Sequence, residues 1–447
     1  MIAVIWCEII VLTLLALYPL LRAKLRGQRI DYFESIYLIS LLFWIVSAGR
    51  AMILLALRFD TVYLQGLRHP ESWVALSLGI FAVTLGLIQL GYYWKPRRTF
   101  WNEAPPAPSR HRYGAVCLGL IIVSGAALWM LARRLGGIPG LDFTLAETLE
   151  FRGVFWLQLL AQSYFAALAL AACVFFAERH LRYLLLTLAI LAVIVLLEAG
   201  LGSKGGLLGP LLILLVGYHY LVRPIRAWLL VVSAIVVLVL VPITYLLRQY
   251  GLNLADVTAG IGSTDFRAPI LLLDFMNRWY DLDMSAVVYQ GVASGQVAHD
   301  WFGVVRDLFV QLIPSSFWPD KPAGYTIQVL RTFAPGVHSE FTGGVISFPA
   351  TLYYSFSWLG VVIGAYLFGR ILNWVQQRLQ AKRDVYHVAL YGVFLYCVTR
   401  YVQGLFSEAT IALIGRMLPF LVLLVVLKTR VARTRASVTA STDVQPA

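Results

Sequence analysis

Apolar runs of about 20 residues recur along most of this chain, and each is long enough to cross a membrane as a single helix. Because hydrocarbon offers the backbone no hydrogen-bond partner, such runs must satisfy their peptide groups internally, as helices do. We therefore predict an all-α, polytopic membrane helix bundle of about 11 spans. The expected spans are residues 2–21, 33–57, 72–93, 113–132, 154–177, 182–200, 205–222, 227–247, 349–373, 385–403 and 409–427.

Composition and charge agree with this class. The chain is 60% hydrophobic and 13% charged, with a mean hydropathy of +0.76, which leaves too little polar surface for a water-soluble protein. The net charge of +13 is explained by short basic connections after every second span, so it does not indicate nucleic-acid binding. These connections are cytoplasmic by the positive-inside rule, which predicts an outer N-terminus and a cytoplasmic C-terminus. They are residues 22–29, 95–112, 179–182, 223–226, 378–383 and 428–435.

One long polar interval divides the bundle. We predict eight spans in 1–247, a large outer loop in 248–348, three further spans in 349–433 and a disordered cytoplasmic tail in 434–447. The outer loop is too apolar to be disordered, and residues 270–276 and 301–313 are expected to be helices lying on or against the bundle. Prolines are expected to break the remainder of this loop into irregular chain. These are Pro314, Pro319, Pro322, Pro335 and Pro349.

Positive residues occur where the positive-inside rule does not place them. Many map to the outer half of a span or to outer loops, among them Arg50 and Arg306. A buried arginine costs several kcal/mol unless it is paired, so each faces a carboxylate such as Glu198 or Glu408, snorkels to the interface, or binds an anion. Outer cations outnumber the nearby carboxylates, which favours an anionic ligand for the set. The residues we select are Lys204, Arg248, Arg267, Arg278, Lys321, Arg400 and Arg416.

Two short motifs each have more than one interpretation. Residues 202–206 form a Gly-Ser-Lys-Gly-Gly turn that could expose backbone N–H groups to an anion at the start of the seventh span, or could simply be a tight turn that needs glycine. Asp281 and Asp283 form a D-x-D pair, but residues two apart diverge on a helix, so a metal site here would need extended backbone. The four cysteines lie in apolar runs and are expected to be small buried hydrophobes.

The outer loop also supplies candidates for proton transfer and for sugar contacts. His338, Glu340 and Asp320 are the candidate general bases, and His338 has the side chain whose ordinary pKa lies nearest neutrality. Aromatic residues in and near the loop belong either to the membrane-interface belt or to rings that stack on sugars. The candidate stacking residues are Trp279, Tyr280 and Trp318, with Trp301, Tyr325, Tyr353 and Tyr354.

Two stretches resemble the Wzy-type O-antigen and oligosaccharide repeat-unit polymerases. They are the Gly-Ser-Lys-Gly turn at 202–205 and the Ile-Pro-Ser-Ser-Phe-Trp-Pro-Asp-Lys-Pro run at 313–322, followed by Ser347 and a Gly360…Gly364 helix. The resemblance implies a GT-C-like membrane glycosyltransferase that polymerises undecaprenyl-diphosphate-linked repeat units at the periplasmic face, with inversion and without metal or cofactor. It implies that Lys204, Arg267, Arg278, Lys321 and Arg416 bind the diphosphate and that His338 is the base.

The same resemblance places the chain as a multi-pass protein of the bacterial inner membrane. Its expected partners are the lipid-linked oligosaccharide, membrane lipid and a chain-length regulator protein. Two alternatives stay open. One is an O-antigen ligase of the same architecture. The other is a polysaccharide or lipid-linked sugar transporter, for which charges at mid-membrane and internal repeats would be expected, and no repeat is visible in the sequence.

Overall fold

The protein is a helical bundle. The computed structural model describes residues 1–61, 63–94, 110–137, 155–200, 204–230, 232–233, 280–313, 317–318, 320, 322, 324–335, 346–402, 406, 409–419 and 422. Regular structure in these residues is helical throughout, without a strand. The helices are α1 (Ile2–Leu25), α2 (Ser35–Trp44), the π-helix η1 (Ile45–Gly49), α3 (Arg50–Ala56), α4 (Pro70–Tyr93), α5 (Arg110–Leu135), α7 (Phe155–Ala161), α8 (Ser163–Glu178), α9 (Leu181–Gly200), α10 (Lys204–Leu221), α14 (Asp281–Ala293), α15 (Gly303–Leu312), α16 (Tyr325–Phe333), α17 (Phe348–Ala381) and α18 (Val385–Val402).

The membrane class predicted from hydropathy is confirmed. Eight helices in the described part of the chain are long and apolar enough to cross a membrane: Ile2–Leu25, Ser35–Ala56, Pro70–Tyr93, Tyr113–Leu135, Leu159–Glu178, Leu181–Glu198, Phe348–Leu379 and Val385–Val402. The predicted spans at 205–222 and 409–427 coincide with two shorter apolar helices, Leu208–Leu221 and Ala409–Pro419. Most of the span predicted at 227–247 lies outside the described residues. The total of 11 therefore stays a prediction.

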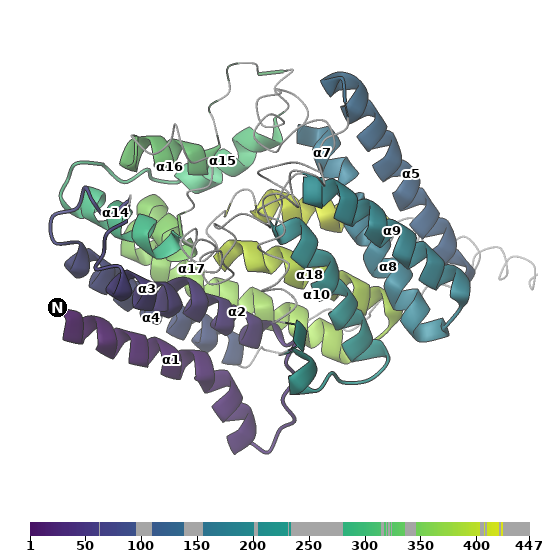
Figure 1. The fold of residues 1–447 in the computed structure, drawn as a ribbon, viewed down its shortest axis with the longest axis horizontal. Helices are drawn as coiled ribbons and strands as arrows, with labels where there is room; N and C mark the ends of the chain where they lie inside the picture. The colour runs from purple at the N-terminus through teal and green to yellow at the C-terminus, as the bar shows by residue number, and fades with distance from the viewer. Residues whose placement is uncertain are drawn as a thin grey trace, which may run out of the picture.

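Two groups of helices share one apolar core. The first contains α1, α2, α4 and α17, and the second contains α5, α8, α9, α10 and α18; α18 packs on both α8 and α2 and joins the groups (Figure 1). The closest approach is between α4 and α17. A Cβ on Gly369 would lie 2.0 Å from the carbonyl oxygen of Ile88, and one on Gly91 would lie 2.2 Å from that of Tyr366. Glycine at these two positions allows the two backbones to touch.

Helix α17 is not one straight span. Ser357 has φ 57° and ψ −156°, which no helix accommodates. The rings of Phe348 and Phe368 are 5.0 Å apart, whereas a straight helix would separate them by about 30 Å. Leu352 likewise contacts Gly364. Residues 348–356 therefore form a half-helix that folds back along 358–381. The span predicted at 349–373 was wrong in its limits. Neither Gly nor Pro stands at the break, so the sequence contains no signal for it.

The described part of the outer loop packs on this hairpin. The helix predicted at 301–313 is present as α15, and α14 is buried against α4 and α17 (Figure 1). The break at Ser357 exposes the carbonyl of Ser355, which accepts a hydrogen bond from the N–H of Phe302 at 3.1 Å. The expectation of irregular chain between the prolines was wrong for α16, because the interval from Pro322 to Pro335 contains no proline and accommodates a helix. The helix predicted at 270–276 lies outside the described residues.

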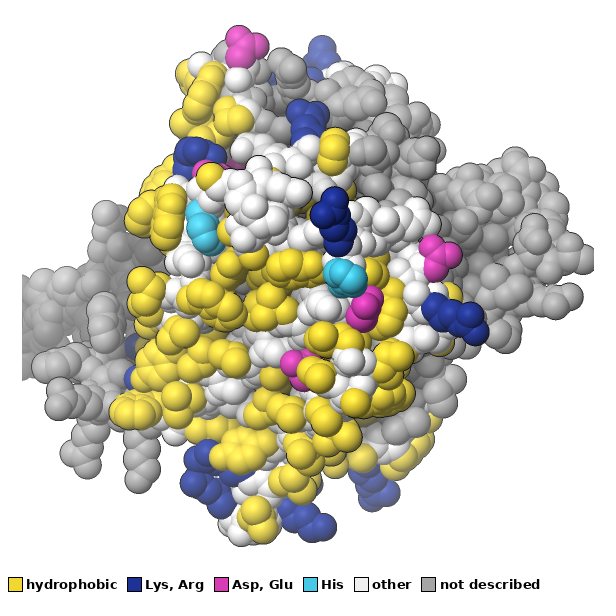
Figure 2. Space-filling view, turned by 90° about the vertical axis from the view of Figure 1, so that its left-hand side faces the viewer, with side chains coloured by type: hydrophobic (Ala, Val, Ile, Leu, Met, Phe, Trp, Pro, Cys, Tyr) yellow, Lys and Arg dark blue, Asp and Glu magenta, His cyan; other side chains and the backbone are white. Residues whose placement is uncertain are grey.

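The bundle has two distinct ends. At the basic end, α17 finishes, α18 starts and α1 finishes with Arg22 and Lys24. At the other, which we call the loop end, α14, α15 and α16 cover the bundle. Figure 2 shows hydrophobic side chains across the middle of one face, with Lys and Arg side chains along its lower edge and others scattered over its upper half. Three cysteines are buried as expected, but Cys7 is exposed, because most of α1 lies on the outside of the bundle.

Candidate functional site

Arg416 is the more deeply buried of the two cations of the predicted anion-binding set whose side chains the structure describes. It belongs to the helix Ala409–Pro419, and its side chain is 1% exposed. Its guanidinium carbon lies 4.7 Å from the ring centroid of Phe165 and 4.6 Å from that of Tyr396. One terminal nitrogen donates to the Sγ atom of Cys397 at 3.7 Å, which is a weak acceptor. Its Nε–H has no hydrogen-bond partner among the described residues.

Arg400 contacts the same tyrosine. It lies one helical turn after Tyr396 on α18, and its Nη2 donates to the Tyr396 hydroxyl at 3.4 Å. Its guanidinium carbon is 5.7 Å from the Tyr396 ring. Two residues predicted separately from the sequence as anion ligands are thus brought together on one aromatic ring. We call Arg400, Arg416, Tyr396, Phe165 and Cys397 the Arg416 cluster.

The start of α10 lies at the level of this cluster. A Cβ on Gly209 would meet the Tyr396 ring at 2.5 Å, and one on Gly392 would meet Ile213 at 3.6 Å, so α10 and α18 run antiparallel with a fixed register. Extending that register toward the N-terminus of α10 places position 204 opposite position 401 of α18. The backbone of Lys204 therefore begins its helix beside Arg400 and Tyr401. The side chain of Lys204 lies outside what the structure describes.

A single carboxylate interacts electrostatically with the Arg416 cluster among the described residues. Glu198, near the end of α9, is buried and accepts a hydrogen bond from the hydroxyl of Tyr164 at 2.5 Å. It attracts Arg416 without forming an ion pair with it. Among the described residues, Glu198 is the carboxylate that acts on Arg416, and it is already bonded to Tyr164. The described part of the cluster therefore has an excess of positive charge in a low-dielectric interior. That surplus favours an anion.

The N-terminus of the half-helix 348–356 is a second source of positive charge inside the bundle. Its first residue lies inside the bundle, where the Phe348 ring is 6.2 Å from that of Phe406 and the Phe406 ring is 5.5 Å from that of Tyr401. Ser347 caps it by accepting from the N–H of Ala350 at 3.3 Å. The N-terminus of a helix carries positive partial charge, and discontinuous helices in transporters present such ends to anionic ligands inside the membrane.

Other outer cations are already paired. Arg50 is 1% exposed and donates from Nε to Asp283 at 2.8 Å and from Nη2 at 3.0 Å, while Thr61 donates to the same carboxylate at 2.9 Å. Arg306 pairs with Asp300 at 3.0 Å. The sequence left three alternatives for such an arginine: a carboxylate partner, snorkelling to the interface or anion binding. Arg50 and Arg306 have a carboxylate partner.

The D-x-D pair lies in the first turn of α14. Asp283 is occupied by Arg50, and Asp281 is buried with its Oδ1 atom unpartnered. Burial raises the pKa of Asp281 to about 7. The extended backbone that a metal pair would need is absent from this turn. In the described residues, no group of three or more His, Cys, Asp or Glu side chains is placed to hold a metal ion.

An aromatic group lies near the break in α17. His299 lies between the rings of Trp301 and Tyr353, each 5.3 Å away, and Trp301 is 59% exposed. The Nδ1 atom of His299 is 3.3 Å from the carbonyl oxygen of Tyr354, which can only accept, so Nδ1 is the donor of this hydrogen bond. This arrangement of an exposed indole beside an imidazole could contact a sugar.

The remaining predicted residues are dispersed or outside the description. Tyr280 packs with its ring 4.8 Å from that of Tyr63 and 5.3 Å from the Arg50 guanidinium carbon. Asp320 and Trp318 are exposed. The structure does not describe Arg248, Arg267, Arg278, Trp279, Lys321, His338 and Glu340.

Sequence reasoning missed Tyr396, which the two arginines share. The four-residue spacing from Tyr396 to Arg400 was a readable signal for that half of the contact. The other half depends on Gly209 and on the fold. Compared with known proteins, the chain matches no protein-family model, no curated protein and no solved structure.

Proposed function

We propose that this chain is a GT-C-like membrane glycosyltransferase that polymerises undecaprenyl-diphosphate-linked oligosaccharide repeat units at the periplasmic face of the bacterial inner membrane. The observation that carries the proposal is the Arg416 cluster. Two arginines meet on one ring inside a membrane bundle, and Glu198, the carboxylate that acts on Arg416 among the described residues, is already bonded to Tyr164. A lipid diphosphate supplies the negative charge at the membrane depth that such a cluster requires.

The chemistry needs little more than position and charge. The acceptor hydroxyl oxygen attacks the anomeric carbon, the bond from that carbon to the diphosphate oxygen breaks, and a base takes the hydroxyl proton. Diphosphate is already a good leaving group, so the arginines act by stabilising the charge that develops on it. In this proposal Arg416 and Arg400 bind the diphosphate with Lys204, and His338, Glu340 or Asp320 accepts the proton. The reaction inverts the anomeric carbon and uses neither metal nor cofactor.

The loop end supplies a surface for the saccharide. Trp301 and Trp358 are 59% and 48% exposed near Tyr353 and His299, and indole rings stack well on sugar faces. We propose that this aromatic group contacts the glycan while the lipid diphosphate occupies the bundle. A chain-length regulator protein is the proposed protein partner.

Purified protein and a lipid-linked repeat unit in detergent test the proposal. We expect a ladder of lengthened glycan from the wild type, none from Arg416→Gln, and a normal ladder from Arg133→Gln, which removes an exposed cation on α5. A transporter makes no product without a second compartment, and a ligase transfers preformed glycan without lengthening it. Absence of a ladder from folded wild type, or a normal ladder from Arg416→Gln, contradicts the proposal.

A further inference from the structure

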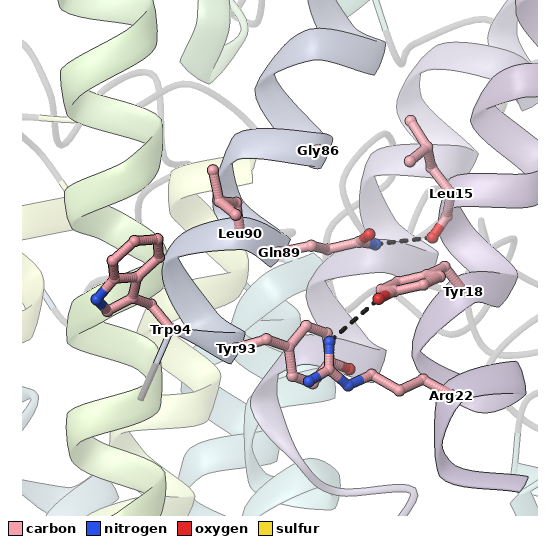
Figure 3. A pocket seen from close by; sticks show the side chains of 8 residues that line it. All are labelled: Leu15, Tyr18, Arg22, Gly86, Gln89, Leu90, Tyr93 and Trp94. Carbon is pink, nitrogen blue, oxygen red and sulfur yellow. Dashed lines mark hydrogen bonds between the residues drawn. The ribbon is translucent and has the colours of Figure 1, made fainter. Parts of the chain in front are cut away.

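A groove lies between α1 and α4 at the basic end of the bundle, away from the Arg416 cluster. Its volume is about 370 Å³, and its lining includes Leu15, Gly86 and Leu90 along the floor and Tyr18, Tyr93 and Arg22 at the mouth (Figure 3). Both helices are membrane spans, and α1 is mostly exposed, so the groove faces the lipid. A gap of this kind in a membrane surface is filled by the surrounding lipid.

A cation with a fixed orientation, Arg22, lies at the mouth of the groove. Arg22 is half-buried, its guanidinium carbon is 3.8 Å from the centroid of Tyr93, and its Nη1 donates to the Tyr18 hydroxyl at 3.1 Å (Figure 3). These two neutral side chains fix the guanidinium in place. Among the described residues no carboxylate forms an ion pair with it. Its remaining N–H groups are donors for an anion.

The surroundings of Arg22 match the headgroup level of a bilayer. Trp94, at the end of α4, is 57% exposed, and its carbonyl accepts from Arg370 at 2.7 Å. Tryptophan and tyrosine rings concentrate at the membrane interface. Lys24 and Arg26 lie two and four residues beyond Arg22, so this end of α1 is basic.

We propose that this groove binds one anionic phospholipid, with an acyl chain along Leu15, Gly86 and Leu90 and the headgroup phosphate on Arg22. Basic pockets between membrane helices recognise anionic headgroups in this way. Position 86 opens onto this space, because a Cβ there would meet no atom within 4 Å. The site is independent of the proposed glycosyltransferase activity and stands or falls separately from it.

Native mass spectrometry of the full chain, with equal amounts of phosphatidylglycerol and phosphatidylcholine added, tests this site. We expect the wild type to retain more phosphatidylglycerol than phosphatidylcholine. Arg22→Ala should reduce retention about tenfold, the size of one charge-assisted hydrogen bond. Lys24→Ala removes the same charge two residues along without touching the groove and should retain the lipid.

A second pair of variants tests the space and not the charge. Gly86→Leu fills the groove and should abolish lipid retention, whereas Gly125→Leu, at an equally open position on α5, should not. Equal retention of the two lipids, or identical behaviour of Arg22→Ala and Lys24→Ala, overturns the proposal. So does a dimer of this chain that Gly86→Leu dissociates, because the occupant is then a second copy.

Discussion

Arg50 and Arg416 differ in what surrounds an equally buried guanidinium. Both are 1% exposed and both lie in apolar runs. Arg50 donates two hydrogen bonds to Asp283, and Thr61 completes that carboxylate. Arg416 has two aromatic rings, a thiol and an unpartnered Nε–H.

The contrast separates a cation with a structural role, Arg50, from one that we propose binds an anion, Arg416. A buried arginine with its own carboxylate is neutralised within the fold and joins distant segments, in this instance the second span and the outer loop. A buried arginine without one keeps its charge available and is stable only where rings, dipoles or a ligand compensate. The predictions below compare these two environments.

Removing the partner of Arg50 should have the largest effect. Asp283→Ala removes the carboxylate that is bonded to the buried Arg50, and breaking a buried ion pair costs about 3 to 5 kcal/mol. We expect a large loss of folded protein in membranes and a much lower unfolding temperature in detergent. Asp300→Ala breaks the exposed pair with Arg306 and should cost less than about 1 kcal/mol. Equal stability of the two variants would show that the Arg50 pair is not a structural link.

The neighbouring Asp281 should make stability depend on pH. Its pKa is about 7 when folded, above the ordinary 3.8, so the folded state binds the proton more tightly. Stability is therefore highest at low pH and falls as the pH rises from about 4 through about 7. Asp281→Asn should be more stable than wild type by roughly 2 to 4 kcal/mol at pH 8, with the gap closing toward pH 4. Thermal unfolding between pH 5 and pH 8 measures this, and parallel curves would refute it.

Arg400 should contribute less to anion binding than Arg416, because it is only half-buried and water screens its charge. We expect Arg400→Gln to weaken binding of a lipid diphosphate about tenfold, the worth of one charged contact. Tyr396→Phe keeps the shared ring and should lose no more than that. Equilibrium binding in detergent gives both values. An effect of Arg400→Gln larger than that of Arg416→Gln would reverse the order that burial predicts.

Thr61→Val should have a smaller effect on stability than Asp283→Ala. It removes one hydrogen bond to Asp283 and preserves the shape of the side chain, and Arg50 continues to satisfy the carboxylate. We expect a loss of about 1 to 2 kcal/mol in the free energy of unfolding. A loss as large as that of Asp283→Ala would mean that the hydroxyl, and not the guanidinium, holds the carboxylate.

Hydropathy was sufficient to predict the eight membrane-crossing helices of the described residues, because each is a local property of about 20 residues. The division of the arginines into paired and unpaired could not be predicted, since Asp283 is 233 positions from Arg50 in sequence. The half-helix 348–356 also left no local signal, because its apolar run continues through Ser357 into the next helix. Burial of α14 depends on the interior that this hairpin and α4 provide.

The candidate site was predictable only as a set of residue types. Arg400 and Arg416 were selected because their charges stand in apolar surroundings, and the structure brings them together through Tyr396. Which arginine lacks a carboxylate depends on helix register, and in particular on Gly209, which admits the tyrosine ring against α10. Single-sequence reasoning has no access to that register.

The most direct measurement compares binding of a polyprenyl diphosphate and the matching neutral polyprenol to the purified chain in detergent. The account predicts that the wild type prefers the diphosphate by about 100-fold, some 2.7 kcal/mol, and that Arg416→Gln removes this preference while Arg133→Gln retains it. Equal affinity of the wild type for the two lipids, or an unchanged preference in Arg416→Gln, would contradict the assignment of the Arg416 cluster as a diphosphate site.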